Sequence, residues 1–199
     1  LVNREARRVQ FLMDSDRLTA VDKALFTALL DREMEEDTLV SSIQELTELL
    51  EIHFNQKVIV LIDEYDVPLA KANQNGYYDK MVLLLRNFLE NVLKTNESLE
   101  FAVLTGCLRI AKESIFTGLN NFKVYSITDA DYDEMFGFND KEVKEMLLTF
   151  DQQEKYDEVK EWYDGYRFGN ADVYCPWDVV NYCADHLTHP GAVPKNYWL

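Results

Sequence analysis

The segment 58–66 (VIVLIDEYD) constrains the fold more than any other part of the sequence. Residues 57–62 form a continuous run rich in β-branched and aliphatic side chains, which is typical of a strand that is buried on both faces of a parallel sheet. Acidic residues follow at once. Because open parallel sheets bind ligands at the carboxyl ends of their strands, we expect Asp63 and Glu64 to lie at a binding site.

The next segments predict a βαβ unit. Residues 78–94 have apolar side chains at helical spacing, and residues 99–105 (LEFAVLT) read as a second buried strand that ends at Thr105. A strand, a helix and a strand in this order favour a parallel pair. Residues 122–127 (FKVYSI) are a candidate third strand.

Helices are expected on either side of this core. The spacing of apolar residues predicts helices over residues 17–33 and 41–54, with Ser41 or Ser42 as the N-cap of the second. Later in the chain, Asn139 followed by Glu142 indicates a capping box.

The character of the sequence changes near residue 130. We therefore predict two domains, an α/β core over residues 1–130 and a mainly helical subdomain over residues 131–199. Within the second domain, residues 162–169 (WYDGYRFG) read as a glycine-punctuated turn, from which Arg167 is a further candidate for reaching a nucleotide.

The amino-acid composition argues against several classes of function for this chain. The net charge of −16 makes the chain a poor candidate for binding DNA or RNA directly, although a magnesium ion can still bring phosphate to an acidic site. Three scattered cysteines without a CxxC pair predict reduced thiols and a cytoplasmic protein rather than a disulfide scaffold. No apolar run is long enough to predict a membrane span.

The chemistry predicted for the strand ends is that of a nucleotide phosphate site. Asp63 is expected to hold Mg²⁺, usually through water, and Glu64 to orient or deprotonate an attacking water. Thr105 would lie beside them and sense the γ-phosphate, and Arg109 would pair with phosphate oxygens, with Lys112 as a weaker candidate. The alternatives are a solvated acidic turn, a threonine that bonds to the backbone, and an arginine in a salt bridge.

A phosphate-binding loop is not recognisable. Such a loop needs GxxxxGK[ST], and none of the seven glycines is followed by Lys-Ser or Lys-Thr. The loop normally precedes the acidic strand, so we expect it upstream of Leu1 or absent. Since the sequence also begins with Leu1 and ends with the apolar Leu199, we expect it to be a segment of a longer protein.

These blocks together resemble a known family. The runs VIVLIDEYDVPLAKANQNGYYDKMVLLLRNFLENVLK, FAVLTGCLRIAKESIFTGLNNF, FGFNDKEV and WYDGYRFGNADVYCPWDVVNY, over roughly residues 57–199, are similar to the predicted AAA-ATPase-like family of bacterial proteins. The resemblance implies a partial P-loop NTPase-like α/β fold followed by a helical lid, with ATP and Mg²⁺ as cofactors. It places Walker B at Asp63 and Glu64 and a sensor at Thr105. It also implies, in the longer protein, a C-terminal nuclease-like domain of the PD-(D/E)XK type.

Three functions remain open at this point. The leading expectation is an ATPase that hydrolyses ATP once an upstream phosphate loop completes it, the fragment alone being inactive. The second is a non-catalytic regulatory or protein-interaction module of the same fold, using the acidic surface and residues 162–182. The third is a metal-dependent nuclease that uses Asp63, Glu64 and Asp66, which the net charge and the lack of a suitably spaced lysine oppose.

Overall fold

The computed structural model describes residues 2–107, 115–116, 118–119 and 121–198. The chain divides into two compact units, Leu1–Phe122 and Lys123–Leu199. Both contain helices and a two-stranded sheet, so the class is α/β with mostly helix. The assignment of residues 1–130 to an ATPase core and 131–199 to a lid stays a prediction. None of the helices in the described part of the chain combines the length and apolar character needed to cross a bilayer.

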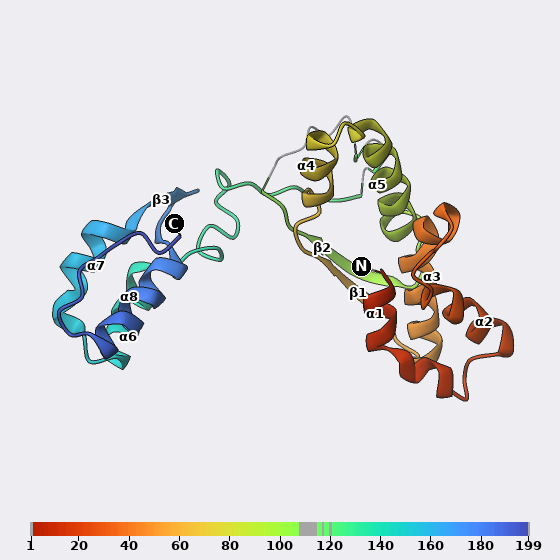
Figure 1. Cartoon of the computed structure of the whole chain (residues 1–199), viewed down its shortest axis with the longest axis horizontal. Coiled ribbons are helices and arrows are strands. Elements are labelled where there is room, and N and C mark those ends of the chain that lie inside the picture. The colour runs from red at the N-terminus through yellow and green to blue at the C-terminus, as the bar shows by residue number, and fades with distance from the viewer. Residues whose placement is uncertain (1, 108–114, 117, 120, 199) are drawn as a thin grey trace. The chain divides into compact units, whose positions relative to one another are not determined.

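The first unit is built from helices around one parallel strand pair (Figure 1). Its elements are α1 (Val2–Arg8), a short 3₁₀ helix η1 (Gln10–Asp14), α2 (Ala20–Leu29), α3 (Glu36–Phe54), β1 (Val58–Ile62), α4 (Val67–Gln74), α5 (Tyr78–Leu93) and β2 (Leu99–Leu104).

The strand pair confirms the predicted βαβ order. β1 and β2 run parallel, with Ile59 opposite Phe101 and Ile62 opposite Leu104. Both α4 and α5 connect them. The predicted helix over residues 78–94 is α5. The other helix, α4, is not among the predicted elements; it starts three residues after Glu64, with Pro68 in its first turn, where a missing backbone N–H costs nothing.

The two faces of this sheet differ, and the expectation of strands buried on both faces is wrong for the described residues. On one face, Ile62 and Leu104 pack against a cluster that includes Leu69, Val82 and Leu89. Side chains of the other face are exposed by 39–74%: Ile59, Leu61, Phe101 and Val103. The apolar run was a correct sign of a parallel strand, but burial depends on what covers each face.

The N-terminal helices form a second cluster beside the sheet. α1, α2 and α3 enclose Phe26, Leu29 and Leu49, which are almost fully buried. The predicted N-cap of the third helix is wrong, because α3 begins at Glu36, with Glu35 in the cap position. The hydroxyl groups of Ser41 and Ser42 instead donate to carbonyl groups one turn earlier within the helix.

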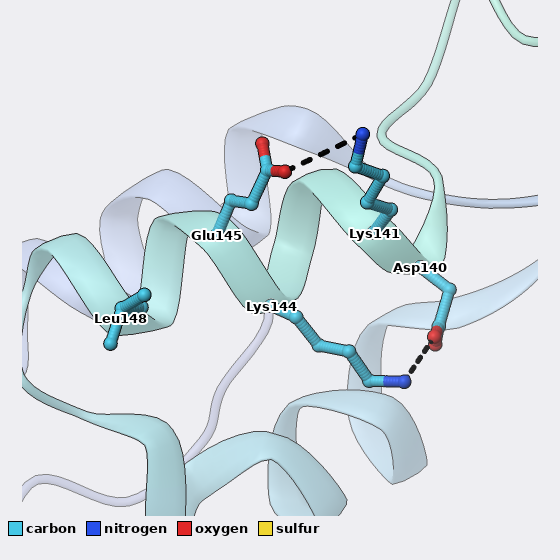
Figure 2. Close-up of a pocket in the computed structure, with 5 residues that line it drawn as sticks. All are labelled: Asp140, Lys141, Lys144, Glu145 and Leu148. Atoms are coloured by element: carbon cyan, nitrogen blue, oxygen red, sulfur yellow. Dashed lines mark hydrogen bonds and ion pairs between the residues drawn. The ribbon is translucent and has the colours of Figure 1, made fainter.

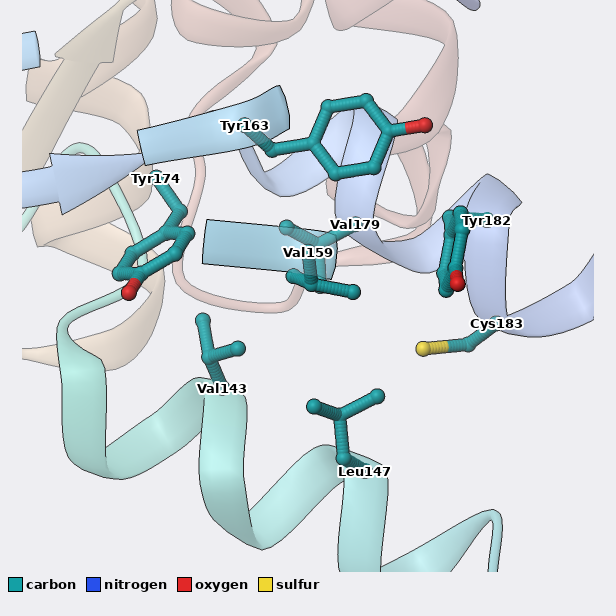
Figure 3. Packing of buried hydrophobic residues seen from close by; sticks show 8 residues of the cluster. All are labelled: Val143, Leu147, Val159, Tyr163, Tyr174, Val179, Tyr182 and Cys183. Carbon is teal, nitrogen blue, oxygen red and sulfur yellow. The ribbon is translucent and has the colours of Figure 1, made fainter. Parts of the chain in front are cut away.

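The second unit packs three helices against a β-hairpin. Its elements are α6 (Asp140–Thr149), the 3₁₀ helix η2 (Gln153–Lys155), α7 (Tyr156–Tyr163), β3 (Asp164–Phe168), β4 (Ala171–Tyr174) and α8 (Pro176–Thr188). Figure 3 shows Val143 and Leu147 of α6 facing Val159 of α7 in the core. The capping box is confirmed, since Asn139 and Glu142 exchange side-chain and backbone hydrogen bonds.

Two predictions in this part of the chain are wrong. Residues 162–169 are not a single turn, because they complete α7 and form β3, with Gly169 alone at the hairpin turn. Residues 122–127 form no strand. The backbone N–H of Ser126 donates to the Asp129 carboxylate at 2.6 Å, so a local turn takes the donor that a sheet would have needed.

Candidate functional site

The carboxyl ends of β1 and β2 meet at one edge of the parallel sheet. Thr105 N–H donates to the carbonyl of Ile62 at 2.9 Å, and Tyr65 N–H donates to the carbonyl of Thr105 at 3.1 Å. These two bonds extend the ladder one step past the strands. They hold the segment after β1 beside the segment after β2.

The same edge brings together two of the predicted site residues. The hydroxyl of Thr105 donates a hydrogen bond to Oδ1 of Asp63, whose side chain is exposed. The alternative in which the Thr105 hydroxyl bonds to the backbone is therefore not what the structure shows. This hydrogen bond fixes the orientation of the Asp63 carboxylate, and an exposed carboxylate is a ligand type that Mg²⁺ uses in proteins.

Glu64 lies next to this contact in an unusual conformation. Its φ angle is 53°, in the left-handed region that residues other than glycine rarely adopt. Such a conformation costs of order 1–3 kcal/mol and is frequent at functional sites. The side chain is exposed, which leaves its carboxylate available to water.

Tyr65 and Gly106 contribute packing that sequence reasoning missed. A Cβ atom on Gly106 would lie 2.7 Å from Cε1 of Tyr65 and 2.9 Å from Oδ1 of Asp66, so the backbone there touches both side chains. Tyr65 in turn stacks edge-on against Phe116, with ring centroids 5.4 Å apart. A glycine directly after a strand is the sequence signal for such a close approach.

Asp66 differs from the other two acids. It is 4% exposed and precedes the first turn of α4. Throughout residues 2–107 and the other described positions, no three His, Cys, Asp or Glu side chains are grouped closely enough to hold a metal ion. The three-carboxylate arrangement that a nuclease site would require at Asp63, Glu64 and Asp66 is therefore not formed.

The predicted cations are Arg109, Lys112 and Arg167. Arg109 and Lys112 lie outside the described residues. Arg167 lies in the second unit, where its Nη1 pairs with Oδ1 of Asp172 across the hairpin at 2.7 Å. Its proposed reach toward a nucleotide therefore competes with an existing ion pair.

A second polar cluster surrounds Asp140 at the start of α6. Hydrogen bonds from Lys144 and Tyr156 lower the pKa of Asp140 from 3.8 to about 2, and Tyr174 donates a further bond at 3.0 Å. The adjoining shallow depression has a volume of about 540 Å³. In Figure 2, Lys144 and Lys141 point toward carboxylates of their own helix. Because these cations are already paired, we assign this cluster a structural role.

Sequence comparison finds a matching protein family and a similar curated protein. The family described as "Predicted AAA-ATPase" matches residues 7–116, a range that contains both strands of the parallel pair and all of the acidic turn. An "Uncharacterized protein in vnfD 5'region" of Azotobacter chroococcum mcd 1 is 29% identical over 134 residues, which is 63% of this chain and 24% of that protein.

The chain thus spans about a quarter of the length of this curated relative. No solved structure matches it significantly. The family match covers more than half of the chain and includes the strand ends where Thr105 bonds to Asp63. The chain belongs to the predicted AAA-ATPase family.

Proposed function

We propose that this chain supplies the magnesium- and water-handling part of an ATP-hydrolysing site. The observation that carries the proposal is the hydrogen bond from Thr105 to Asp63 at the carboxyl edge of a parallel strand pair, with Glu64 next in sequence. In open parallel sheets, this edge is where ligands bind. Membership in the predicted AAA-ATPase family supports ATP as the ligand.

The residues present fit Mg²⁺ of the kind that bridges nucleotide phosphates. Mg²⁺ usually keeps several waters and takes only one or two protein carboxylates, the remaining ligands coming from phosphate oxygens. One exposed carboxylate, Asp63, held by one hydroxyl, suits that mode better than a complete protein cage. When bound, the ion would neutralise charge on the phosphates.

Each of the other residues then has a distinct role. Glu64 orients or deprotonates the water that attacks the γ-phosphate, and its exposed carboxylate and fixed backbone suit that task. Thr105 holds Asp63 and lies where a polar group can sense the γ-phosphate. Arg109 remains a candidate for pairing with phosphate oxygens, four residues after Thr105 in the sequence.

The proposal requires a phosphate-binding loop from outside these 199 residues, because no glycine here precedes Lys-Ser or Lys-Thr. The uncovered sheet face supports this requirement. Parallel sheets are normally covered on both faces, yet Leu61 is 74% and Phe101 is 58% exposed. Helices from the segment that carries the loop would cover such a face.

The test joins this chain to the proposed phosphate-binding loop and compares ATP turnover by that longer protein with turnover by its Glu64→Gln variant, at saturating ATP and Mg²⁺. Removing the water-activating carboxylate should lower kcat by about 100-fold or more while ATP still binds. Asp63→Asn serves as the companion variant and should raise the Mg²⁺ concentration needed for half-maximal turnover. Equal turnover by the wild-type protein and Glu64→Gln would contradict the catalytic assignment.

A non-catalytic interaction module is the second candidate. Exposed aromatic residues of the second unit favour it, since Trp162 and Trp177 are each 54% exposed. The same longer protein separates the two candidates. Nucleotide binding without any turnover, unchanged by Glu64→Gln, supports the interaction module instead of the ATPase.

A further inference from the structure

Helix α8 (Pro176–Thr188) carries an apolar stripe on its outer side. Trp177, Val180, Ala184 and Leu187 follow one another at spacings of three, four and three residues, which places them on one side of a helix. Trp177 is 54%, Val180 43% and Leu187 58% exposed. The opposite side of the helix carries Tyr182, which is buried in the core of the second unit. The core of the second unit therefore lies on the other side of the helix from the stripe.

Trp198 extends the stripe at the N-terminal end of the helix. Its ring lies 6.1 Å from that of Trp177, at an interplanar angle of 50°, and is 69% exposed. The indole N–H of Trp177 donates to the carbonyl of Tyr197 at 3.0 Å, and that of Trp198 donates to Sγ of Cys175 at 3.2 Å. The N–H group of each indole is thus hydrogen-bonded within the chain, and the ring surfaces are exposed to solvent.

The segment that carries Trp198 is fastened to the helix. Tyr197 N–H donates to Oδ1 of Asp178 at 3.0 Å, and the Tyr197 hydroxyl donates to Oδ2 of Asp185 at 3.0 Å. Lys195 pairs with the same Asp185 carboxylate at 2.7 Å. Since these contacts restrain the two tryptophans before any partner arrives, binding to them would lose little side-chain entropy.

The negative charge of the chain favours some classes of partner for this surface over others. Acidic side chains outnumber basic ones by more than two to one in residues 123–199, and the whole chain has a net charge of −16. Such a charge repels nucleic acid, anionic lipid and a second copy of the chain. It attracts cationic segments, whose Lys and Arg side chains also interact favourably with exposed tryptophan rings.

We propose that the α8 stripe, defined as Trp177, Val180, Ala184, Leu187 and Trp198, docks a basic amphipathic helix of a partner protein. The apolar side of that helix covers the stripe, and its basic residues are attracted by the net negative charge of the chain. Large aromatic residues in a preordered position are the usual energetic centre of such an interface. This interaction is independent of ATP hydrolysis at the strand ends.

The experiment uses the 199-residue chain and a designed helical peptide with leucine along one side and lysine on the other, measured by titration calorimetry. A peptide with glutamate in place of every lysine is the first control. We expect the basic peptide to bind, its affinity to fall as salt is added, and the acidic peptide not to bind.

Variants locate the binding surface. Trp177→Ala combined with Trp198→Ala should lower the affinity for the basic peptide by about tenfold or more. Leu187→Glu, at an exposed position where folding is not at risk, should weaken it as well. Trp162→Ala is the matched control, because Trp162 is as exposed as Trp177 but lies on α7 outside the stripe, and it should bind within about twofold of the wild type.

Three results would overturn the proposal. One is the absence of binding by the basic peptide. Another is equal binding by the wild type and the stripe variants, which would mean that charge alone attracts the peptide. The third is a dimer in sedimentation velocity that Leu187→Glu dissociates, which would assign the stripe to a second copy of the chain.

Discussion

The hydroxyl of Thr105 donates a hydrogen bond to the carboxylate of Asp63, so two strand ends that are 42 residues apart in sequence share one polar contact. The contact exists because β1 and β2 run parallel and end at the same edge. It gives the first prediction. In a protein that joins this chain to the proposed phosphate-binding loop, Thr105→Val keeps the β-branched shape but loses the hydroxyl, and ATP turnover should fall by about 10- to 100-fold.

Thr105→Ser is the control for this loss, because it keeps the hydroxyl that donates to Asp63. Its turnover should stay within a few-fold of the wild type. Turnover assays at saturating ATP and Mg²⁺ decide the matter. If Thr105→Val is as active as Thr105→Ser, the contact has no part in catalysis.

The left-handed backbone at Glu64 gives a prediction about stability. Glu64→Gly and Glu64→Ala both remove the carboxylate, but only glycine adopts φ 53° without strain. We expect Glu64→Gly to have the higher free energy of unfolding of the two, by about 1 kcal/mol, in urea denaturation followed by far-UV circular dichroism. The opposite order is expected at Ala24 in the middle of α2, where Ala24→Gly should lose about 1 kcal/mol.

The three tryptophans allow the two units to be followed separately. Trp162, Trp177 and Trp198 all lie in the second unit, so their fluorescence reports its unfolding, whereas circular dichroism reports both units. If Glu64→Ala is at least as stable as Glu64→Gly while the fluorescence transition is unchanged, then the backbone at Glu64 is not strained in solution.

The contact of Gly106 with Tyr65 and Asp66 predicts overpacking in Gly106→Ala. The new Cβ would lie 2.7 Å from the Tyr65 ring, and the variant should lose about 1–3 kcal/mol of unfolding free energy in urea denaturation. Gly191→Ala is the control, because nothing lies within 4 Å of its Cβ position. In a Tyr65→Ala background, the cost of Gly106→Ala should be smaller, and strict additivity would argue against this contact.

The cysteines should differ in reactivity. Burial raises the pKa of Cys183 to about 11, so little thiolate is present at neutral pH, whereas Cys107 is exposed. With a disulfide-exchange reagent near pH 8, we expect Cys107 to react rapidly and Cys183 only after denaturation. Cys107→Ser should abolish the fast phase. A fast phase that survives in this variant would assign the reactive thiol elsewhere.

The Asp140 cluster predicts an acid-sensitive second unit. In the folded chain, hydrogen bonds from Lys144 and Tyr156 lower the pKa of the Asp140 carboxyl group from the ordinary value of 3.8 to about 2. The stabilisation is therefore complete above about pH 4 and is lost as the pH falls toward about 2. Trp fluorescence during unfolding should show a smaller loss of stability over this range in Asp140→Asn than in the wild type. Equal pH profiles would contradict the assignment.

Part of the fold could be predicted from local sequence alone. The apolar run before Asp63, the helical spacing of residues 78–94 and the Asn139 capping box are each specified within a few consecutive residues, and each is confirmed. Ser41 is not an N-cap because α3 already begins at Glu36, so the Ser41 hydroxyl donates to a carbonyl group within the helix instead.

The sequence by itself determined the two parallel strands, the helix over residues 78–94 between them and the acids after the first strand, but not the additional helix α4. Those properties depend on side-chain periodicity and on neighbours in the chain. Only the tertiary structure decided which sheet face is covered, that Thr105 bonds to Asp63, that Gly106 receives Tyr65, and that Asp66 is buried apart from the other acids. These depend on contacts between distant segments, whose packing no local pattern encodes.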